Sequence, residues 1–97
     1  MRVIKDILGN QYRLTDERWA HITANHPELN RRKSDLADCL LNPEVIVKSA
    51  NDPFILIYQK QEQDRHYLAV VTHMSKKFII TAFITDKIKL GKIIWQK

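Results

Sequence analysis

The stretch Phe78-Ile79-Ile80-Thr81-Ala82-Phe83-Ile84-Thr85 predicts the central strand of this protein. Successive side chains of a strand point to opposite faces of its sheet. One face is therefore wholly apolar, and we expect the helices to cover it; it contains Phe78, Ile80, Ala82 and Ile84. The opposite face mixes two large apolar groups with two hydroxyls, which suits a ligand better than a core; it contains Ile79, Thr81, Phe83 and Thr85.

Other segments rich in β-branched or aromatic residues predict strands at 45–48, 54–60, 66–73 and 93–96. Their connections are short and polar, which indicates sequential antiparallel pairing without helical crossovers. Near the N-terminus, the turn pair Gly9-Asn10 predicts a short hairpin or an extended arm. Because a shift of one residue in register exchanges the two faces of a strand, the pattern leaves open whether His66 or His73 joins the threonine face.

Two helices are predicted ahead of these strands. Thr15 has the properties of an N-cap, and Pro27 ends the first helix near His26. The second helix spans 34–41 and is capped by Ser34. Helices followed by a run of strands favour a single α+β domain that includes all 97 residues. In it, the N-terminal helices pack on one face of a four- to five-stranded antiparallel sheet.

Charge and composition restrict the function. The net charge is +5 and the pI is near 9.5, which favours phosphate backbones, acidic proteins or anionic membranes as partners. Cations gather at Arg31-Arg32-Lys33 and after residue 75, where six lysines accompany one acid, Asp86. A solvated basic surface is the alternative interpretation. The single cysteine, Cys39, favours a reducing, cytoplasmic location, and no apolar segment approaches the roughly 20 residues of a membrane helix.

The first helix brings polar groups together. Arg18, His21 and Asn25 recur at spacings of three and four, so they share one stripe, and His26 lies on the neighbouring stripe four residues after Ile22. The helix would therefore present an imidazole and a guanidinium at the edge of its buried face. A purely structural role is the alternative for both histidines, for example an imidazole that caps the last carbonyls.

Several motifs in order along the chain resemble the phage-associated nucleases of the barnase, EndoU, colicin and RelE class (BECR fold, PBECR-type). They are Leu14-Thr15-Asp16-Glu17-Arg18-Trp19-Ala20-His21-Ile22, His26-Pro27-Glu28, Leu41-Asn42-Pro43-Glu44-Val45, the run 79–89 and Gly91 with Trp95. The resemblance extends over nearly the whole chain. It implies a metal-independent endoribonuclease, found as a phage-encoded domain, a polymorphic toxin or a toxin-antitoxin component, on an α+β fold.

Such an enzyme needs a base for the 2′-hydroxyl proton, cations for the phosphorane and an acid for the departing 5′-oxygen. His21 is the first candidate for the base or acid, because imidazoles exchange protons near neutral pH, and His26 is the second. Thr81 and Thr85 would hydrogen-bond phosphate oxygens or the 2′-hydroxyl. Tyr58 would stack a base or donate a proton.

Five cations are the expected contacts to the RNA backbone: Arg18, Lys60, Arg31, Arg32 and Lys87. The expected partners are RNA, with tRNA and mRNA as the candidate classes, and a protein inhibitor or antitoxin. No cofactor or metal is expected, since the sequence has no HExxH motif or paired cysteines. The alternative function is a non-catalytic RNA- or protein-binding module on the same fold.

Overall fold

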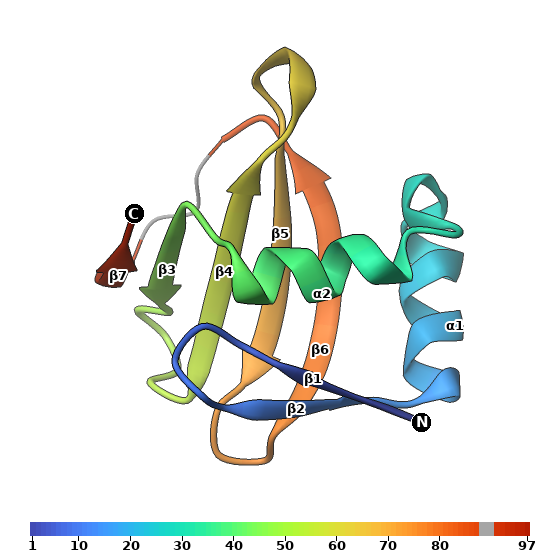
Figure 1. Cartoon of the computed structure of the whole chain (residues 1–97), viewed down its shortest axis with the longest axis horizontal. Coiled ribbons are helices and arrows are strands. Elements are labelled where there is room, and N and C mark those ends of the chain that lie inside the picture. The colour runs from blue at the N-terminus through green and yellow to red at the C-terminus, as the bar shows by residue number, and fades with distance from the viewer. Residues whose placement is uncertain (88–90) are drawn as a thin grey trace.

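A computed structural model of the chain, which describes residues 1–87 and 91–97, contains one seven-stranded sheet and two α-helices (Figure 1). The strands stand in the order β1-β2-β6-β5-β4-β3-β7. Along the chain they are β1 (Arg2–Lys5), β2 (Gln11–Leu14), β3 (Val45–Lys48), β4 (Ile55–Gln61), β5 (Tyr67–His73), β6 (Phe78–Thr85) and β7 (Lys92–Gln96). The predicted strand segments are therefore close to the observed ones.

The predicted four- to five-stranded antiparallel sheet is wrong, because the observed sheet is larger and mixed. β2 pairs with β6 in the parallel direction, through Arg13 opposite Phe78, and this brings the N-terminal hairpin into the sheet. β7 pairs with β3 at the far edge instead of with β6, the strand that precedes it. Both pairings join segments distant in sequence, which a local pattern of apolar residues does not specify.

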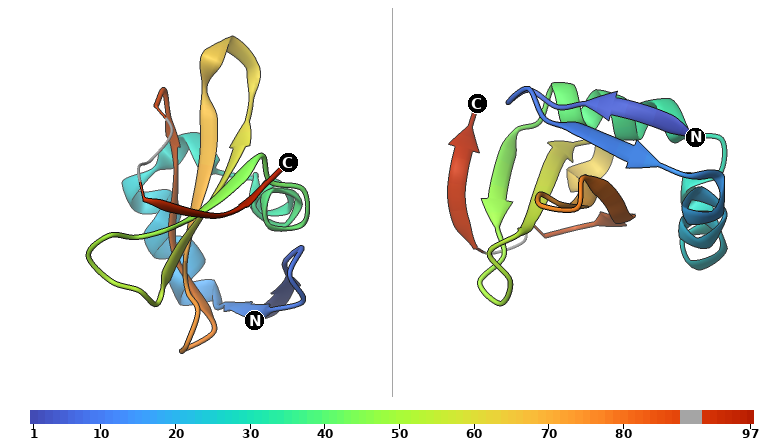
Figure 2. Two further views of the ribbon diagram at one scale, coloured as in Figure 1. Left: turned by 90° about the vertical axis from the view of Figure 1, so that its left-hand side faces the viewer. Right: turned by 90° about the horizontal axis from the view of Figure 1, so that it is seen from below.

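The two helices also lie differently from the prediction. α2 (Lys33–Leu41) crosses one face of the sheet and packs on β4, β5 and β1. α1 (Asp16–Asn25) stands beside β6, displaced toward the opposite side of the sheet (Figure 2). Short 3₁₀ turns occur at Pro27–Leu29 and Gln63–Arg65. The expectation that the N-terminal helices share one face is therefore wrong; we call the α2 side the inner face and the other side the outer face.

The core lies between the inner face, α2 and the β1-β2 hairpin, which folds over the same side of the sheet as α2 (Figure 2). Its buried side chains come from every layer; they include Ile4, Tyr12, Leu14, Ile22, Leu36, Leu40, Ile46, Leu56, Tyr58, Leu68, Val70 and Ile79. Trp95 of β7 packs against this cluster, so it closes the core. No helix in residues 1–87 or 91–97 is long and apolar enough to cross a membrane.

A β-bulge in β6 changes which residues face the core. The β5–β6 pairing places Thr81 opposite Val71 but Ile79 opposite Thr72, so Ile80 is the extra residue. A bulge of this kind exchanges the faces of the residues on one side of it. Ile79 is consequently buried with Ala82, whereas Phe78 joins Thr81 on the outer face, contrary to the predicted alternation.

The β5–β6 register also determines which of His66 and His73 lies on the threonine face, a question that the sequence left open. His73 pairs with Phe78, so it shares the outer face with Thr81. His66 lies just before β5 and lines a cavity beside α2. The threonine face is therefore joined by His73 and not by His66.

Candidate functional site

Two small cavities meet at the N-terminal end of α1. The first, which we call the His21 recess, has a volume of about 330 Å³ and is lined by Thr15, Glu17, Arg18 and His21. The second, which we call the Phe78 recess, has a volume of about 250 Å³ and is lined by Arg13, Thr15, Arg18, Phe78 and Ile79. Thr15 and Arg18 line both cavities, so an imidazole, a carboxylate and two guanidiniums lie in adjoining spaces.

The helix cap positions the side chains of the His21 recess. The hydroxyl oxygen of Thr15 accepts the backbone N–H of Arg18 at 3.1 Å, as the N-cap prediction requires. Because residues three and four apart are neighbours on a helix, Arg18 and Glu17 both lie beside His21. At the next turn, the side-chain amide of Asn25 donates to the His21 carbonyl at 3.0 Å and lies 3.4 Å from the imidazole Nε2. Arg18, His21 and Asn25 therefore lie along one side of α1, on the stripe that the sequence predicts.

Backbone carbonyls hold the two guanidiniums of the Phe78 recess. Arg13 donates from Nη2 to the Lys76 carbonyl at 2.8 Å, and Arg18 lies 3.4 Å from the Ile80 carbonyl. The guanidinium carbon of Arg18 lies 5.7 Å from the centroid of the Phe78 ring. Neither arginine has a carboxylate partner among the described side chains. Their positive charge is therefore available to an anion.

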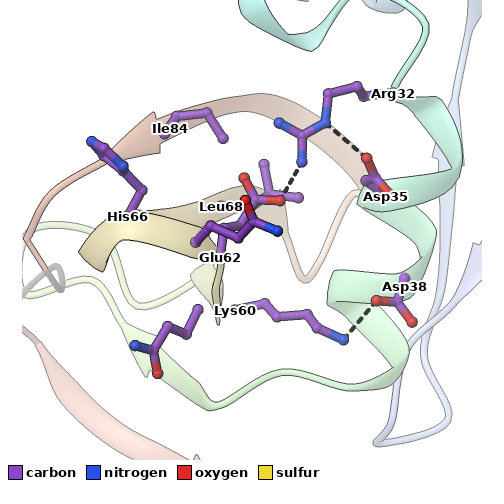
Figure 3. Close-up of a pocket in the computed structure, with 10 residues that line it drawn as sticks. Arg32, Asp35, Asp38, Lys60, Glu62, His66, Leu68 and Ile84 are labelled. Atoms are coloured by element: carbon purple, nitrogen blue, oxygen red, sulfur yellow. Dashed lines mark hydrogen bonds and ion pairs between the residues drawn. The ribbon is translucent and has the colours of Figure 1, made fainter.

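Arg32 and Lys60, two predicted RNA contacts, line a different cavity of about 480 Å³ between α2 and the sheet (Figure 3). Arg32 donates hydrogen bonds to both Glu62 and Asp35. The bond to Glu62 is the main reason that the pKa of Arg32 is raised, and the bond to Asp35 adds to the effect. Lys60 donates to Asp38 at 2.6 Å. Three carboxylates thus neutralise two cations, so a phosphate would have to displace an ion pair. The predicted RNA-binding role of Arg32 and Lys60 is not supported by this arrangement.

The second histidine candidate lies apart from the first. The ring centroid of His26 is 5.9 Å from that of Phe83, whose neighbours on the outer face of β6 are Thr81 and Thr85. The hydroxyl of Thr85 is engaged with the backbone of Lys87. His26 therefore lies beside the threonine strand, whereas His21 lies with the arginines. Neither threonine lines the His21 or the Phe78 recess.

Tyr58 is in the core, so the prediction that it stacks a base or donates a proton is wrong. Its ring packs edge-on against Tyr12, and its hydroxyl donates to the buried carboxylate of Asp6. Burial is the main reason that the pKa of Tyr58 is raised, and its hydrogen bonds with Asp6 and Tyr12 add to the effect. Arg31 and Lys87 are exposed and line neither recess.

Sequence reasoning missed three residues of the site. Glu17 was not among the predicted site residues, although the spacing of four to His21 is visible in the sequence. Arg13 comes from β2 and reaches Arg18 only through the parallel pairing with β6. Phe78 was assigned to the core and is turned outward by the bulge at Ile80.

No protein-family model, curated protein sequence or solved structure gives a significant match to this chain. Within the described residues, no group of three or more His, Cys, Asp or Glu side chains is arranged to hold a metal ion. Cys39 lies on the buried side of α2, and this burial raises the pKa of its thiol to about 12. The thiol is therefore unsuited to nucleophilic chemistry near neutral pH.

Proposed function

We propose that the protein is a metal-independent endoribonuclease whose active site is the His21 recess. The observation that supports this proposal best is that Glu17, Arg18 and His21 line one cavity and that Arg13 lies in the adjoining one. A carboxylate, an imidazole and guanidiniums are the groups that cleavage of RNA through its own 2′-hydroxyl requires. The resemblance of the sequence motifs to phage-associated nucleases favours the same reaction.

In the proposed reaction Glu17 accepts the proton of the 2′-hydroxyl, and the 2′-oxygen attacks the adjacent phosphorus. The bond from phosphorus to the 5′-oxygen breaks, which leaves a 2′,3′-cyclic phosphate on one fragment. The imidazolium of His21 gives its proton to the departing 5′-oxygen. Arg18 neutralises the charge that develops on the phosphorane, and Arg13 binds the neighbouring phosphate.

A non-catalytic RNA-binding module is the second candidate function. It is favoured by the two guanidiniums of the Phe78 recess, which have no carboxylate partner among the described side chains and bind phosphate whether or not His21 transfers protons. A toxin-like or phage-associated role, with a protein inhibitor or antitoxin as partner, belongs to the proposal through the resemblance alone. A cytoplasmic location is proposed because the one cysteine, Cys39, is a buried free thiol.

The test is incubation of the purified protein with total RNA and with a transfer-RNA pool in EDTA. We expect discrete fragments from the wild type and from His66→Ala, a matched exposed histidine outside both recesses. His21→Ala should cleave about 10²- to 10⁴-fold more slowly and still bind RNA. A wild type that binds RNA but leaves it intact would identify the binding module instead. Loss of cleavage in His26→Ala, with His21→Ala active, would move the site to the threonine strand.

A further inference from the structure

A row of planar side chains continues outward from the Phe78 recess. The centroids of Phe54 and His73 are 5.9 Å apart with planes inclined by 13°, and those of His73 and Phe78 are 5.9 Å apart with planes inclined by 8°. The guanidinium of Arg18 completes the row over the Phe78 ring. We call Phe54, His73 and Phe78 the aromatic row. It arises because Ile55 and Phe78 both pair with His73, which aligns three neighbouring strands at one level.

The aromatic row is open to solvent at its outer end. Phe54 is 49% exposed, and His73 and Phe78 are partly exposed. The Nδ1 atom of His73 accepts the backbone N–H of Lys76 at 3.0 Å, so a neutral His73 ring has its proton on Nε2. His73 therefore offers a fixed hydrogen-bond donor between two phenyl rings.

The charge beside the aromatic row is positive. Lys76 and Lys77 follow His73 in the β5–β6 turn and are exposed. Arg13 binds the carbonyls of the same turn, and Arg18 belongs both to this row and to the two recesses. Aromatic rings next to cations are the combination by which proteins bind single-stranded nucleic acid, since bases stack on the rings while phosphates meet the cations.

We infer that the aromatic row stacks unpaired bases of single-stranded RNA and that the substrate of the proposed endoribonuclease is therefore single-stranded rather than duplex. This inference rests on the proposed function for the identity of the polymer. A duplex keeps its base faces stacked on one another, so it offers no face to Phe54 or Phe78. Phe54, at the open end of the row, is the ring on which a base stacks, and Arg18, at the other end and shared with the His21 recess, meets a phosphate of the same strand.

The test measures binding without cleavage, by fluorescence anisotropy with a short 2′-O-methyl RNA whose blocked 2′-oxygen cannot attack. Three probes are compared: the intact single strand, the same strand with abasic positions, and the strand annealed to its complement. The variants are Phe54→Ala, Phe54→Trp, which retains a stacking surface, and Ile93→Ala, a matched exposed apolar residue on β7 that is 54% exposed.

We expect Phe54→Ala to weaken binding of the intact single strand about tenfold, and Phe54→Trp and Ile93→Ala to bind like the wild type. Abasic positions should weaken wild-type binding to a similar extent and affect Phe54→Ala little. Equal wild-type affinity for all three probes, or Phe54→Ala indistinguishable from Ile93→Ala, would overturn the inference even if RNA is cleaved in EDTA. If the expected binding pattern is found but RNA is not cleaved, base stacking on the aromatic row is supported and the proposed catalysis is overturned.

Discussion

Arg13 of β2 lies opposite Phe78 of β6, in the parallel pairing that joins the N-terminal hairpin to the sheet. The guanidinium of Arg13 donates to the carbonyl of Lys76, two residues before Phe78. The same hairpin buries Tyr12 and Leu14 in the core. One element therefore both closes the core and adds a second cation to the site beside α1.

Removal of that cation should weaken RNA binding. We expect Arg13→Ala to lower affinity for all RNA sequences similarly and to reduce the slope of log affinity against log salt by about 1, because one phosphate contact is lost. Binding titrations at several salt concentrations measure this slope. The matched control is Arg32→Ala, which should leave the slope unchanged because Glu62 and Asp35 already neutralise Arg32. A larger effect at Arg32 than at Arg13 would place RNA in the cavity beside α2.

The buried hydroxyl of Tyr58 should stabilise the fold through Asp6. Asp6 accepts from Tyr58 and from the backbone N–H groups of Leu8 and Asn10, and it is almost fully buried. Tyr58→Phe leaves this carboxylate without its side-chain donor from β4, so we expect the free energy of unfolding to fall by about 1–3 kcal/mol. Tyr12→Phe should cost less, about 0.5–1.5 kcal/mol, because among the described residues the Tyr12 hydroxyl bonds only to that of Tyr58. Urea denaturation measures both, and equal stability of Tyr58→Phe and wild type would contradict the assignment.

The Lys60–Asp38 pair should stabilise the fold fully above the unfolded pKa of Asp38 and progressively less at lower pH. Hydrogen bonds from Lys60, then from Asn42, lower the pKa of Asp38 in the folded state. A carboxylate whose pKa is lower in the folded than in the unfolded state stabilises the fold above its unfolded pKa of about 3.9. This stabilisation is lost as the pH falls through the folded pKa. A double-mutant cycle with Asp38→Asn and Lys60→Met should give about 0.2–1 kcal/mol at pH 7, since the pair is half-exposed, and a smaller coupling at pH 2. A coupling that is larger at pH 2 than at pH 7 would refute the pairing.

Cys39 should be unreactive in the folded protein. Its thiol is buried, and its pKa is raised to about 12 by that burial. We expect negligible reaction with a disulfide reagent at pH 8 in buffer and modification of one thiol per chain in guanidinium chloride. Rapid modification of the folded chain would show that the space beneath α2 opens readily.

The local elements of this fold could be predicted from the sequence, but their arrangement could not. Thr15 caps α1 as its side chain predicts, and the β3 and β6 segments begin and end at the expected residues. The second helix begins at Lys33 without a side-chain cap, so Ser34 is not the cap that was predicted. The mixed sheet depends on where β2 and β7 pair, and those contacts join residues distant in sequence.

The candidate site was predictable to the extent that it lies on one helix. Arg18 and His21 are three residues apart, and helical periodicity alone places them together. The positions of Phe78 and His73 on the outer face depend on the bulge at Ile80 and on the strand register. The alternation of residues in β6 reveals neither. The ion pairs of Arg32 and Lys60 could not be predicted, because the carboxylate partners come from α2 and from the segment after β4.

We propose that RNA is cleaved through its own 2′-hydroxyl in the His21 recess. Mass spectrometry of fragments produced in EDTA tests it most directly. We predict fragments that end in a 2′,3′-cyclic phosphate or its hydrolysis product, matched by 5′-hydroxyl ends, and about 10²-fold or greater loss of them in His21→Ala. Fragments with 3′-hydroxyl and 5′-phosphate ends, or undiminished cleavage by His21→Ala, would contradict the account.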